Sequence, residues 1–212
     1  MGFKIIVVTD RTIMSKPFAD KIADISDSGA DMIILREKDL SESEYRYLAT
    51  ESAAICTEYG VPLCINTFVE TAKSMNIGRI QLPLGRMRIL TDRTGLNSVG
   101  VSVHSFKEAE EAVDLGADYL IAGPVYPTEC KPDAKPKGPD LIEELCRSFD
   151  VPVYGIGGIT AYNIRHIASS GGSGVCIRSS AMRTDNLNLL IRELKTNFEA
   201  GLEHLELAGN FV

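Results

Sequence analysis

Short apolar segments alternate with amphipathic segments along the whole chain. The apolar segments are rich in Ile and Val and show little alternation of apolar and polar positions, which is typical of strands buried on both faces of a parallel sheet. Each is followed by a stretch with helical periodicity, so the pattern predicts eight βα units. The expected strands are residues 5–8, 32–35, 61–65, 80–82, 99–103, 119–122, 151–154 and 175–177.

Helix start signals separate the expected strands. Ser41 and Ser105 are each followed three residues later by Glu, which is the pattern of a capping box. Thr160 is expected to cap a helix over residues 161–169, and Pro139 suits the first turn of another helix. These signals predict a helix after each of the strands concerned.

Three glycine segments are expected to end helices at regular intervals. They begin at Gly29, at Gly116 and, as a looser copy, at Gly171, and glycine supplies the left-handed residue that follows a helix. Their separations of 87 and 55 residues correspond to three and two units of roughly 28 residues, near the size of a βαβ element. A unit repeated in this way favours a closed α/β structure, a single (β/α)8 TIM-barrel domain over residues 1–212.

An open, doubly wound sheet is the alternative architecture. Its dinucleotide fingerprint would place G-x-G-x-x-G directly after the first strand. That strand instead ends in Thr9-Asp10-Arg11, and the later segment 155–160 lacks the third glycine. The sequence therefore favours the barrel.

Composition narrows the class of protein and its partners. The net charge is −7 and no run of Lys and Arg occurs, which argues against nucleic acid and anionic membranes as partners. The first apolar run is too short for a secretory signal, and no stretch approaches the ~20 apolar residues of a membrane helix, so we expect a cytoplasmic protein. The five cysteines are scattered without C-x-x-C spacing, which favours reduced thiols over disulfides or a zinc site.

Two segments after the last expected strands fit a phosphate group. The site of a (β/α)8 barrel lies at the carboxyl ends of its strands, and phosphate commonly binds after strands seven and eight. The backbone at Gly157 and Gly158 can approach a ligand closely and turn N–H groups toward an anion. Arg178 and Ser179 add a cation and a hydroxyl. The sequence predicts a small phosphorylated ligand, with an ordinary glycine turn and helix cap as the alternative.

Other polar residues follow the remaining strands. Ser102 and His104 are two residues apart, so in an extended strand they point to the same side. His104 is a candidate acid or base, and a hydrogen-bonded capping role is the alternative. Residues 36–38 are either functional or a solvated charged cluster. The further candidates from these strand ends are Arg36, Lys38, Asn66, Gln81, Thr128, Glu129, Cys130 and Lys131.

Five segments, taken in order, resemble the thiamin-phosphate synthase and TenI family. They are residues 34–39, 64–66, 102–105, 123–132 and 155–160, and they extend over nearly the whole chain. The synthase branch joins a pyrimidine pyrophosphate to a thiazole phosphate. The resemblance implies that the pyrophosphate meets Arg36, Lys38, Asn66 and Lys131, and that the thiazole phosphate meets Gly157, Gly158 and Ser179.

The synthase reaction needs Mg²⁺, which prefers carboxylate oxygens. Where the family has an Asp after the third strand this chain has Thr67, and near the second Asp position it has Arg86. Ile34 and Cys130 also replace a Gln and a Thr of the family. The loss of both aspartates indicates a site without a metal, with Glu37 as the nearest carboxylate that could compensate.

The TenI branch also lacks those aspartates, and residues 81–83, 102–105 and 128–131 resemble it specifically. That branch includes thiazole tautomerases, which move a proton without a metal. Its catalytic His would follow Gly123, where this chain has Pro124. The resemblance then leaves His104, Glu129 or Cys130 as the acid or base.

Three functions therefore stay open. The first is a metal-free thiazole phosphate tautomerase of the TenI kind, which is the function we expect. The second is a synthase that couples the two substrates with Mg²⁺ as its only cofactor, and the third is a non-catalytic barrel that binds or senses a phosphorylated ligand. The partner in each case is a small phosphorylated molecule, and a homodimer is expected only because dimers are the commonest closed assembly.

Overall fold

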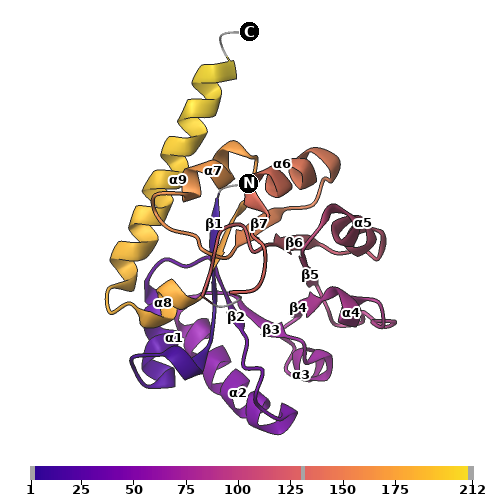
Figure 1. Ribbon diagram of the computed structural model, residues 1–212. Coiled ribbons are helices and arrows are strands. Elements are labelled where there is room, and N and C mark those ends of the chain that lie inside the picture. Colours follow the sequence, from indigo (N-terminus) through magenta and orange to yellow (C-terminus); the bar gives the residue numbers. More distant parts are fainter. Residues whose placement is uncertain (1–2, 130–131, 210–212) are drawn as a thin grey trace.

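Eight parallel strands form a closed ring in the order of the sequence, and helices surround it (Figure 1). This computed structural model describes residues 3–129 and 132–209, with the side chains of the last helix described as far as residue 202. Strand β1 pairs with β2 on one side and with β8 on the other, so the sheet has no edge. The predicted (β/α)8 barrel is confirmed. Its strands are β1 Lys4–Val8, β2 Met32–Leu35, β3 Leu63–Asn66, β4 Arg79–Pro83, β5 Ser98–Val103, β6 Tyr119–Ala122, β7 Val153–Ile156 and β8 Gly174–Ile177.

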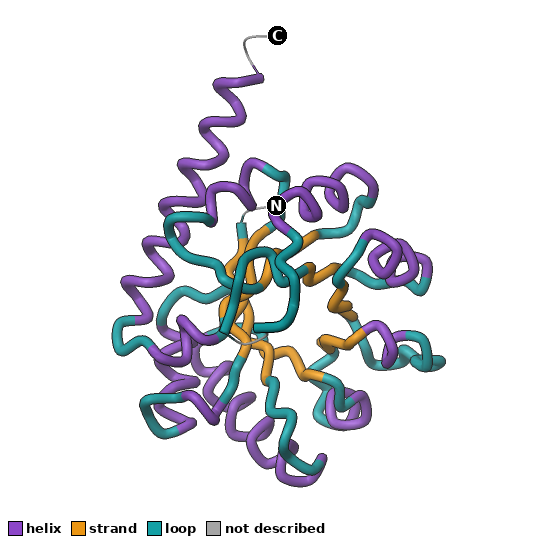
Figure 2. Tube along the Cα trace, in the orientation of Figure 1, coloured by secondary structure: helices purple, strands orange, loops and turns teal. Residues whose placement is uncertain are grey.

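The helices lie on the outside of the ring, as Figure 2 shows in purple around the orange strands. Among the described residues they are a short 3-10 turn η1 Arg11–Ile13 and the helices α1 Phe18–Asp27, α2 Glu42–Tyr59, α3 Val69–Ser74, α4 Leu84–Met87, α5 Phe106–Asp114, α6 Gly138–Ser148, α7 Ile164–Ser169, α8 Ser179–Arg183 and α9 Leu187–Gly209. None of these helices combines the length and the apolar composition that a bilayer crossing requires.

Two strands begin later than predicted, and proline explains both differences. The predictions placed Pro62 and Pro152 inside strands β3 and β7. Each proline instead stands directly before its strand, where its carbonyl still accepts a bond of 2.9 Å from the neighbouring strand. Proline has no N–H to donate to the ladder, so regular pairing starts after it. Strand β7 ends at Ile156, two residues after its predicted end and directly before the loop that contains Gly157 and Gly158.

The predicted helix caps are confirmed in part. Ser41 forms a complete capping box with Glu44. Ser105 caps α5 by accepting from the Glu108 N–H at 3.3 Å, but the Glu108 carboxylate accepts from the His104 N–H at 2.7 Å. The reciprocal bond therefore goes to the residue before the cap.

The prediction of a helix over residues 161–169 was wrong at its start. Helix α7 begins at Ile164, and Thr160 and Asn163 instead hydrogen-bond each other. The Thr160 N–H donates to the Asn163 side-chain oxygen at 2.9 Å, and the Thr160 hydroxyl accepts from the Asn163 N–H at 3.3 Å. This closed polar turn replaces the first turn of the helix.

Both faces of the sheet are buried, which explains the lack of alternation in the strands. Ile5 and Val7 face the helices, whereas Ile6 and Val8 face the inside of the ring. The interior also holds the side chains of Ile34, Cys64, Tyr119, Ile121, Tyr154 and Cys176. Burial raises the pKa of the Cys64 thiol to about 12. The described cysteines are all free, as predicted: Cys56, Cys64, Cys146 and Cys176.

Helix α9 packs along the side of the barrel and extends beyond it (Figure 1). Phe198 of this helix is buried and stacks on Phe3 with 3.6 Å between the ring centroids. Lys195 donates to the Gly29 carbonyl at 2.6 Å. The helix is thereby attached next to the strand at which the ring closes.

Ring closure requires a glycine at the first position of β8. Gly174 has a φ of +154°, and a Cβ there would collide with the Lys4 carbonyl of β1. We expect Gly174→Ala to lower the free energy of unfolding by about 1–3 kcal/mol, because overpacking and backbone strain add.

Denaturant unfolding measures this change. Gly85→Ala is the matched control, since Gly85 lies in α4 with open space around it. The control should leave stability unchanged or raise it by about 1 kcal/mol or less. Equal effects of the two substitutions would contradict the steric explanation.

Candidate active site at the carboxyl ends of the strands

A cavity of about 820 Å³ opens at the carboxyl ends of the strands. This volume lies within the roughly 300–1,000 Å³ range of small-molecule sites. Every strand of the ring ends at this rim, so residues far apart in sequence meet here. The predicted site residues that line the cavity are Arg36, Lys38, Asn66, Gln81, Ser102, His104, Thr128, Glu129, Gly157, Gly158, Arg178 and Ser179.

Two predicted residues, Cys130 and Lys131, lie outside the described part of the chain. Polar residues of the cavity wall that were not predicted as site residues include Thr160, Ser180 and Arg183. Arg183 lies four residues after Ser179 in helix α8, so both belong to one face of the helix. The i, i+4 spacing from Ser179 was the signal that could have identified it.

The cavity is positively charged, although the chain carries a net charge of −7. Four cationic side chains and one carboxylate, Glu129, occur in its described lining. Arg183 pairs with Glu129 at 3.0 Å, and Arg178 pairs with Asp10 at 3.4 Å. Glu129 is 84% exposed, so water screens its charge. The cavity is therefore suited to anionic ligands.

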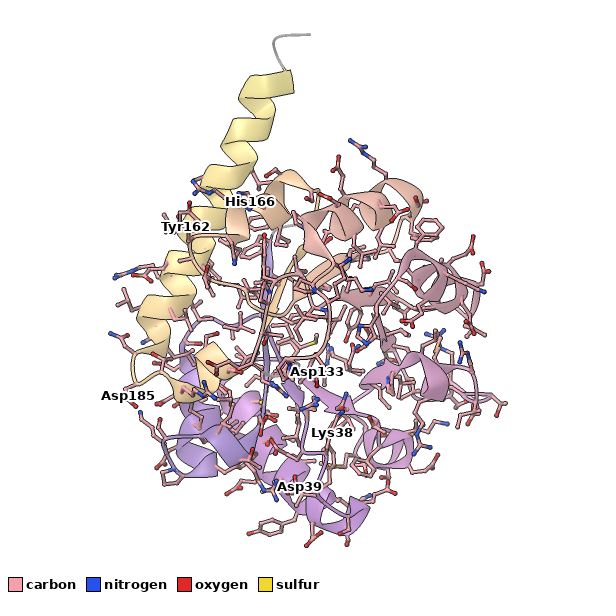
Figure 3. The ribbon with its side chains drawn as sticks, in the orientation of Figure 1. Lys38, Asp39, Asp133, Tyr162, His166 and Asp185 are labelled. Carbon is pink, nitrogen blue, oxygen red and sulfur yellow. The ribbon has the colours of Figure 1, made fainter. Side chains whose placement is uncertain are left out.

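The cations lie on two sides of the ring. The β2–β3 side is defined here as Arg36, Lys38 and Asn66, and the β7–β8 side as Gly157, Gly158, Arg178 and Ser179. The cations of these two sides follow strands β2 and β8, which are separated in the ring by β1 alone, whereas the uncharged Asn66 and Gly157 stand at the ends of β3 and β7, which are opposite each other. In Figure 3 Lys38 lies nearer the middle of the molecule than its neighbour Asp39, which lies farther out.

Glu37 does not lie in the cavity, so its expected role as a substitute metal ligand is not supported. Its side chain is 1% exposed and faces the end of β1 instead. There its carboxylate accepts from the Thr9 hydroxyl at 2.6 Å and from the Arg11 N–H at 3.1 Å. The carboxylate is satisfied by these protein donors.

A chain of hydrogen bonds orders the wall between the two sides. The Asn66 amide group donates to the Gln81 backbone carbonyl at 3.1 Å, and the Gln81 amide donates to the Ser102 hydroxyl at 2.9 Å. The Asn66 N–H donates to the buried Tyr45 hydroxyl at 3.0 Å. The side-chain oxygen of Gln81 is buried without a hydrogen-bond partner among the described residues. This wall presents amide and hydroxyl groups, which fit the polar edge of a heterocycle.

His104 lies beside this wall with one ring nitrogen engaged. Its Nδ1 hydrogen-bonds the Gly123 carbonyl. A carbonyl oxygen only accepts, so Nδ1 carries the proton in this bond and the neutral ring keeps its lone pair on Nε2. His104 therefore has both the location and the tautomer of a proton acceptor.

The glycines of the β7 loop have a packing role in addition to the predicted one. Gly157 and Gly158 have φ values of +98° and +63°. A Cβ on Gly157 would lie 2.8 Å from Pro124, and one on Gly158 would lie 2.7 Å from Tyr126. The loop after β6 also pairs with this loop, since the Tyr126 N–H donates to the Gly157 carbonyl at 3.0 Å. Glycine is thus required by neighbouring backbone as well as by a ligand that approaches closely.

The described residues of the cavity do not fit a Mg²⁺ ion. No group of three or more His, Cys, Asp or Glu residues that could hold a metal occurs in the described part of the chain. Thr67 lies in the wall where the family would supply a carboxylate, and Arg86 lies on α4, exposed and away from the cavity. Mg²⁺ prefers carboxylate oxygens, and the one carboxylate in the described lining already pairs with Arg183.

Thr67 has an unusual backbone conformation for its residue type. Its φ is +72°, where β-branched residues are strained and Asn and Asp are comparatively frequent. We therefore expect Thr67→Asn to raise the free energy of unfolding by about 1 kcal/mol. Thr50→Asn, at a position inside helix α2, is the control and should lower stability slightly or not at all. A destabilised Thr67→Asn variant in denaturant unfolding would show that Thr67 is not strained.

Comparisons with known proteins agree on one family. The family model for thiamine monophosphate synthase matches residues 5–181. A thiamine-phosphate synthase of Alkaliphilus oremlandii is 32% identical over 206 residues, 94% of this chain and 97% of the relative. One from Geobacillus kaustophilus is 35% identical over 175 residues, 78% of each chain.

A solved structure supports the same family. Thiamine phosphate pyrophosphorylase from Pyrococcus furiosus superimposes with a TM-score of 0.81 and 29% identity, over 94% of this chain and 97% of that one. The relatives named here are synthases or pyrophosphorylases, so the expected closeness to the TenI branch is not supported.

Proposed function

The chain belongs to the thiamine monophosphate synthase family, and we propose that it is a transferase that joins a pyrimidine pyrophosphate to a thiazole phosphate. This differs from the tautomerase expected from the sequence, and the synthase relatives are the reason for the change. The products are the coupled thiamine phosphate and inorganic pyrophosphate.

One observation carries the proposal: the cavity offers cations and donors on two separate sides. A coupling reaction needs one anion site for the pyrophosphate of one substrate and another for the phosphate of the second. An isomerase that acts on a single thiazole carboxylate phosphate needs one phosphate site and one contact for the carboxylate. We assign the pyrophosphate to the β2–β3 side and the thiazole phosphate to the β7–β8 side.

The chemistry of coupling places its largest electrostatic demand on the β2–β3 side. A bond forms between the thiazole and the pyrimidine-bearing carbon, while the bond from that carbon to the pyrophosphate oxygen breaks. The electron pair of the broken bond leaves with the pyrophosphate. Fixed cations that face the leaving group stabilise this charge as it develops. Arg36 and Lys38 are the residues to which we assign that task.

The wall between the two sides would orient the substrates. Asn66, Gln81 and Ser102, linked by hydrogen bonds, would line the space in which a heterocycle is held. When both reactants are bound in one cavity, the bimolecular reaction becomes effectively unimolecular, which lowers its entropic barrier. Since magnesium does not fit the described donor set, we assign the leaving-group charge to protein cations.

A proton shift on the thiazole phosphate alone is a second candidate function. It is favoured by one observation, the position of His104 in the cavity wall with Nε2 as its acceptor nitrogen. Such a reaction on a thiazole carboxylate phosphate would use the β7–β8 side for the phosphate and a cation of the β2–β3 side for the carboxylate. The synthase relatives are why we rank the transferase first.

Coupling is the first test. Purified protein supplied with pyrimidine pyrophosphate and thiazole phosphate should form thiamine phosphate and pyrophosphate in equal amounts, and added EDTA should leave the rate unchanged. Chromatography and a pyrophosphate assay measure the two products. Activity abolished by EDTA and restored by Mg²⁺ would contradict the assignment of charge neutralisation to the protein. Isomerised thiazole phosphate without coupling would instead support the second candidate.

Arg178→Ala tests the β7–β8 side. A charge-assisted bond contributes about 1.5–3 kcal/mol, so KM for the thiazole phosphate should rise by roughly 10- to 150-fold. KM for the pyrimidine pyrophosphate should change much less. Arg88→Ala is the control, because it breaks an ion pair with Glu111 on the outside of the barrel. An unchanged KM for the thiazole phosphate would remove Arg178 from the site.

A further inference from the structure

Glu37 stands between two cavity residues but does not line the cavity itself. Arg36 and Lys38 are in the lining, whereas the Glu37 side chain is 1% exposed beneath the loop. Asp39, the next residue, also faces away from the cavity and binds Arg11 through two bonds of 2.6 Å. Residues 36 and 37 follow β2 directly, and residues 38 and 39 lie in a turn. The bonds of Glu37 and Asp39 attach both parts of this segment to the residues that follow β1, while Arg36 and Lys38 line the cavity.

The end of strand β1 provides the partners for Glu37. One carboxylate oxygen accepts from the Thr9 hydroxyl at 2.6 Å. The other accepts from the Arg11 backbone N–H at 3.1 Å and from its guanidinium at 3.4 Å. A buried carboxylate is costly unless it is paired and hydrogen-bonded, and here both conditions hold. The hydrogen bonds to Asp39 also raise the pKa of Arg11, so this partner stays charged.

Thr9 links this carboxylate to the backbone of the cavity loop. Its hydroxyl donates to Glu37 and accepts from the Arg36 N–H at 2.9 Å. Its own N–H donates to the Ile34 carbonyl at 3.0 Å, which continues the pairing of β1 with β2. Thr9 is fully buried, so water does not compete for these bonds. The Thr9 hydroxyl therefore holds the backbone of Arg36, the first cationic residue of the cavity loop.

We propose that Glu37 is a positioning residue, held by Thr9 and Arg11, that turns Arg36 and Lys38 toward a pyrophosphate in the cavity. The role of those cations rests on the proposed function, but their capacity to bind pyrophosphate does not require turnover. Strand β1 lies between β8 and β2 in the ring, so its end also reaches the other side of the cavity. There Asp10 pairs with Arg178 at 3.4 Å. Substitution of Asp10, which lies between Thr9 and Arg11, can therefore be compared with substitution of Glu37.

Glu37→Gln is the decisive variant. The shape of the side chain is kept, but the charge is lost and an amide N–H₂ group faces the donors of Arg11. We expect the Kd for inorganic pyrophosphate, measured by titration calorimetry, to rise at least tenfold. In the coupling assay KM for the pyrimidine pyrophosphate should rise similarly, with KM for the thiazole phosphate within twofold of the original. Asp10→Asn should instead raise KM for the thiazole phosphate and leave KM for the pyrimidine pyrophosphate within twofold of the original.

Thr9 supplies a second test that preserves every charge. Thr9→Val removes both hydroxyl bonds at nearly constant volume, and we expect it to weaken pyrophosphate binding at least fivefold. Thr9→Ser keeps the hydroxyl and should restore binding to within twofold. Glu111→Gln is the matched control, since it removes a carboxylate that bonds an arginine twice, at 2.5 and 2.8 Å, outside the cavity. Thermal unfolding of every variant separates loss of binding from loss of fold.

The possible outcomes are distinct. Pyrophosphate binding that is unchanged in Glu37→Gln and Thr9→Val would overturn the positioning role, as would equal weakening of both substrates. If the original protein binds pyrophosphate and forms no coupled product, the proposed function fails, while a selective loss of binding in these variants still supports the positioning role. If the original protein does not bind pyrophosphate, both proposals are overturned.

Discussion

Strand β1 pairs in parallel with β8, the last strand of the chain, over Lys4 to Val7. This pairing closes eight parallel strands into a ring, so all carboxyl ends meet at one rim, and it requires a glycine at position 174, where the backbone of β1 passes. Closure also places the end of β1 between the segments that follow β2 and β8. From that position three consecutive residues, Thr9, Asp10 and Arg11, contact both cation-bearing sides of the cavity.

Positive charges line the cavity, and the nearby negative charges of Glu37 and Asp10 lie outside its lining. Asp10 pairs with Arg178 of the lining, and Glu37 pairs with Arg11 behind it. This arrangement gives an acidic chain a local surface that attracts anions, because nearby charges outweigh distant screened ones. The ion pairs of Arg178 and Arg183 restrain these side chains before a ligand arrives, which lowers the entropic cost of binding.

Family membership and site chemistry are separate conclusions for this protein. Similarity over most of the chain establishes the family. The side chains at individual positions determine which version of the chemistry is possible, and here Thr67 stands in the wall where the family's carboxylate is expected. Thr67 nevertheless has a backbone conformation that Asn and Asp favour, so the backbone at this position of the wall suits those residue types better than Thr.

The barrel could be predicted from local features that can be counted along the chain, namely Ile- and Val-rich segments without alternation and glycines at regular spacing. The sequence also placed Arg36, Asn66, His104 and Gly157 at strand ends, and a closed parallel ring brings all such ends together. The directions of the Glu37 and Asp39 side chains follow only from the folded chain, since their partners Thr9 and Arg11 are more than twenty residues away in sequence. The tertiary structure likewise decided that Glu37 is buried, that Arg86 lies outside the cavity and that Arg183 lies inside it, because burial and side-chain direction follow from packing between distant segments.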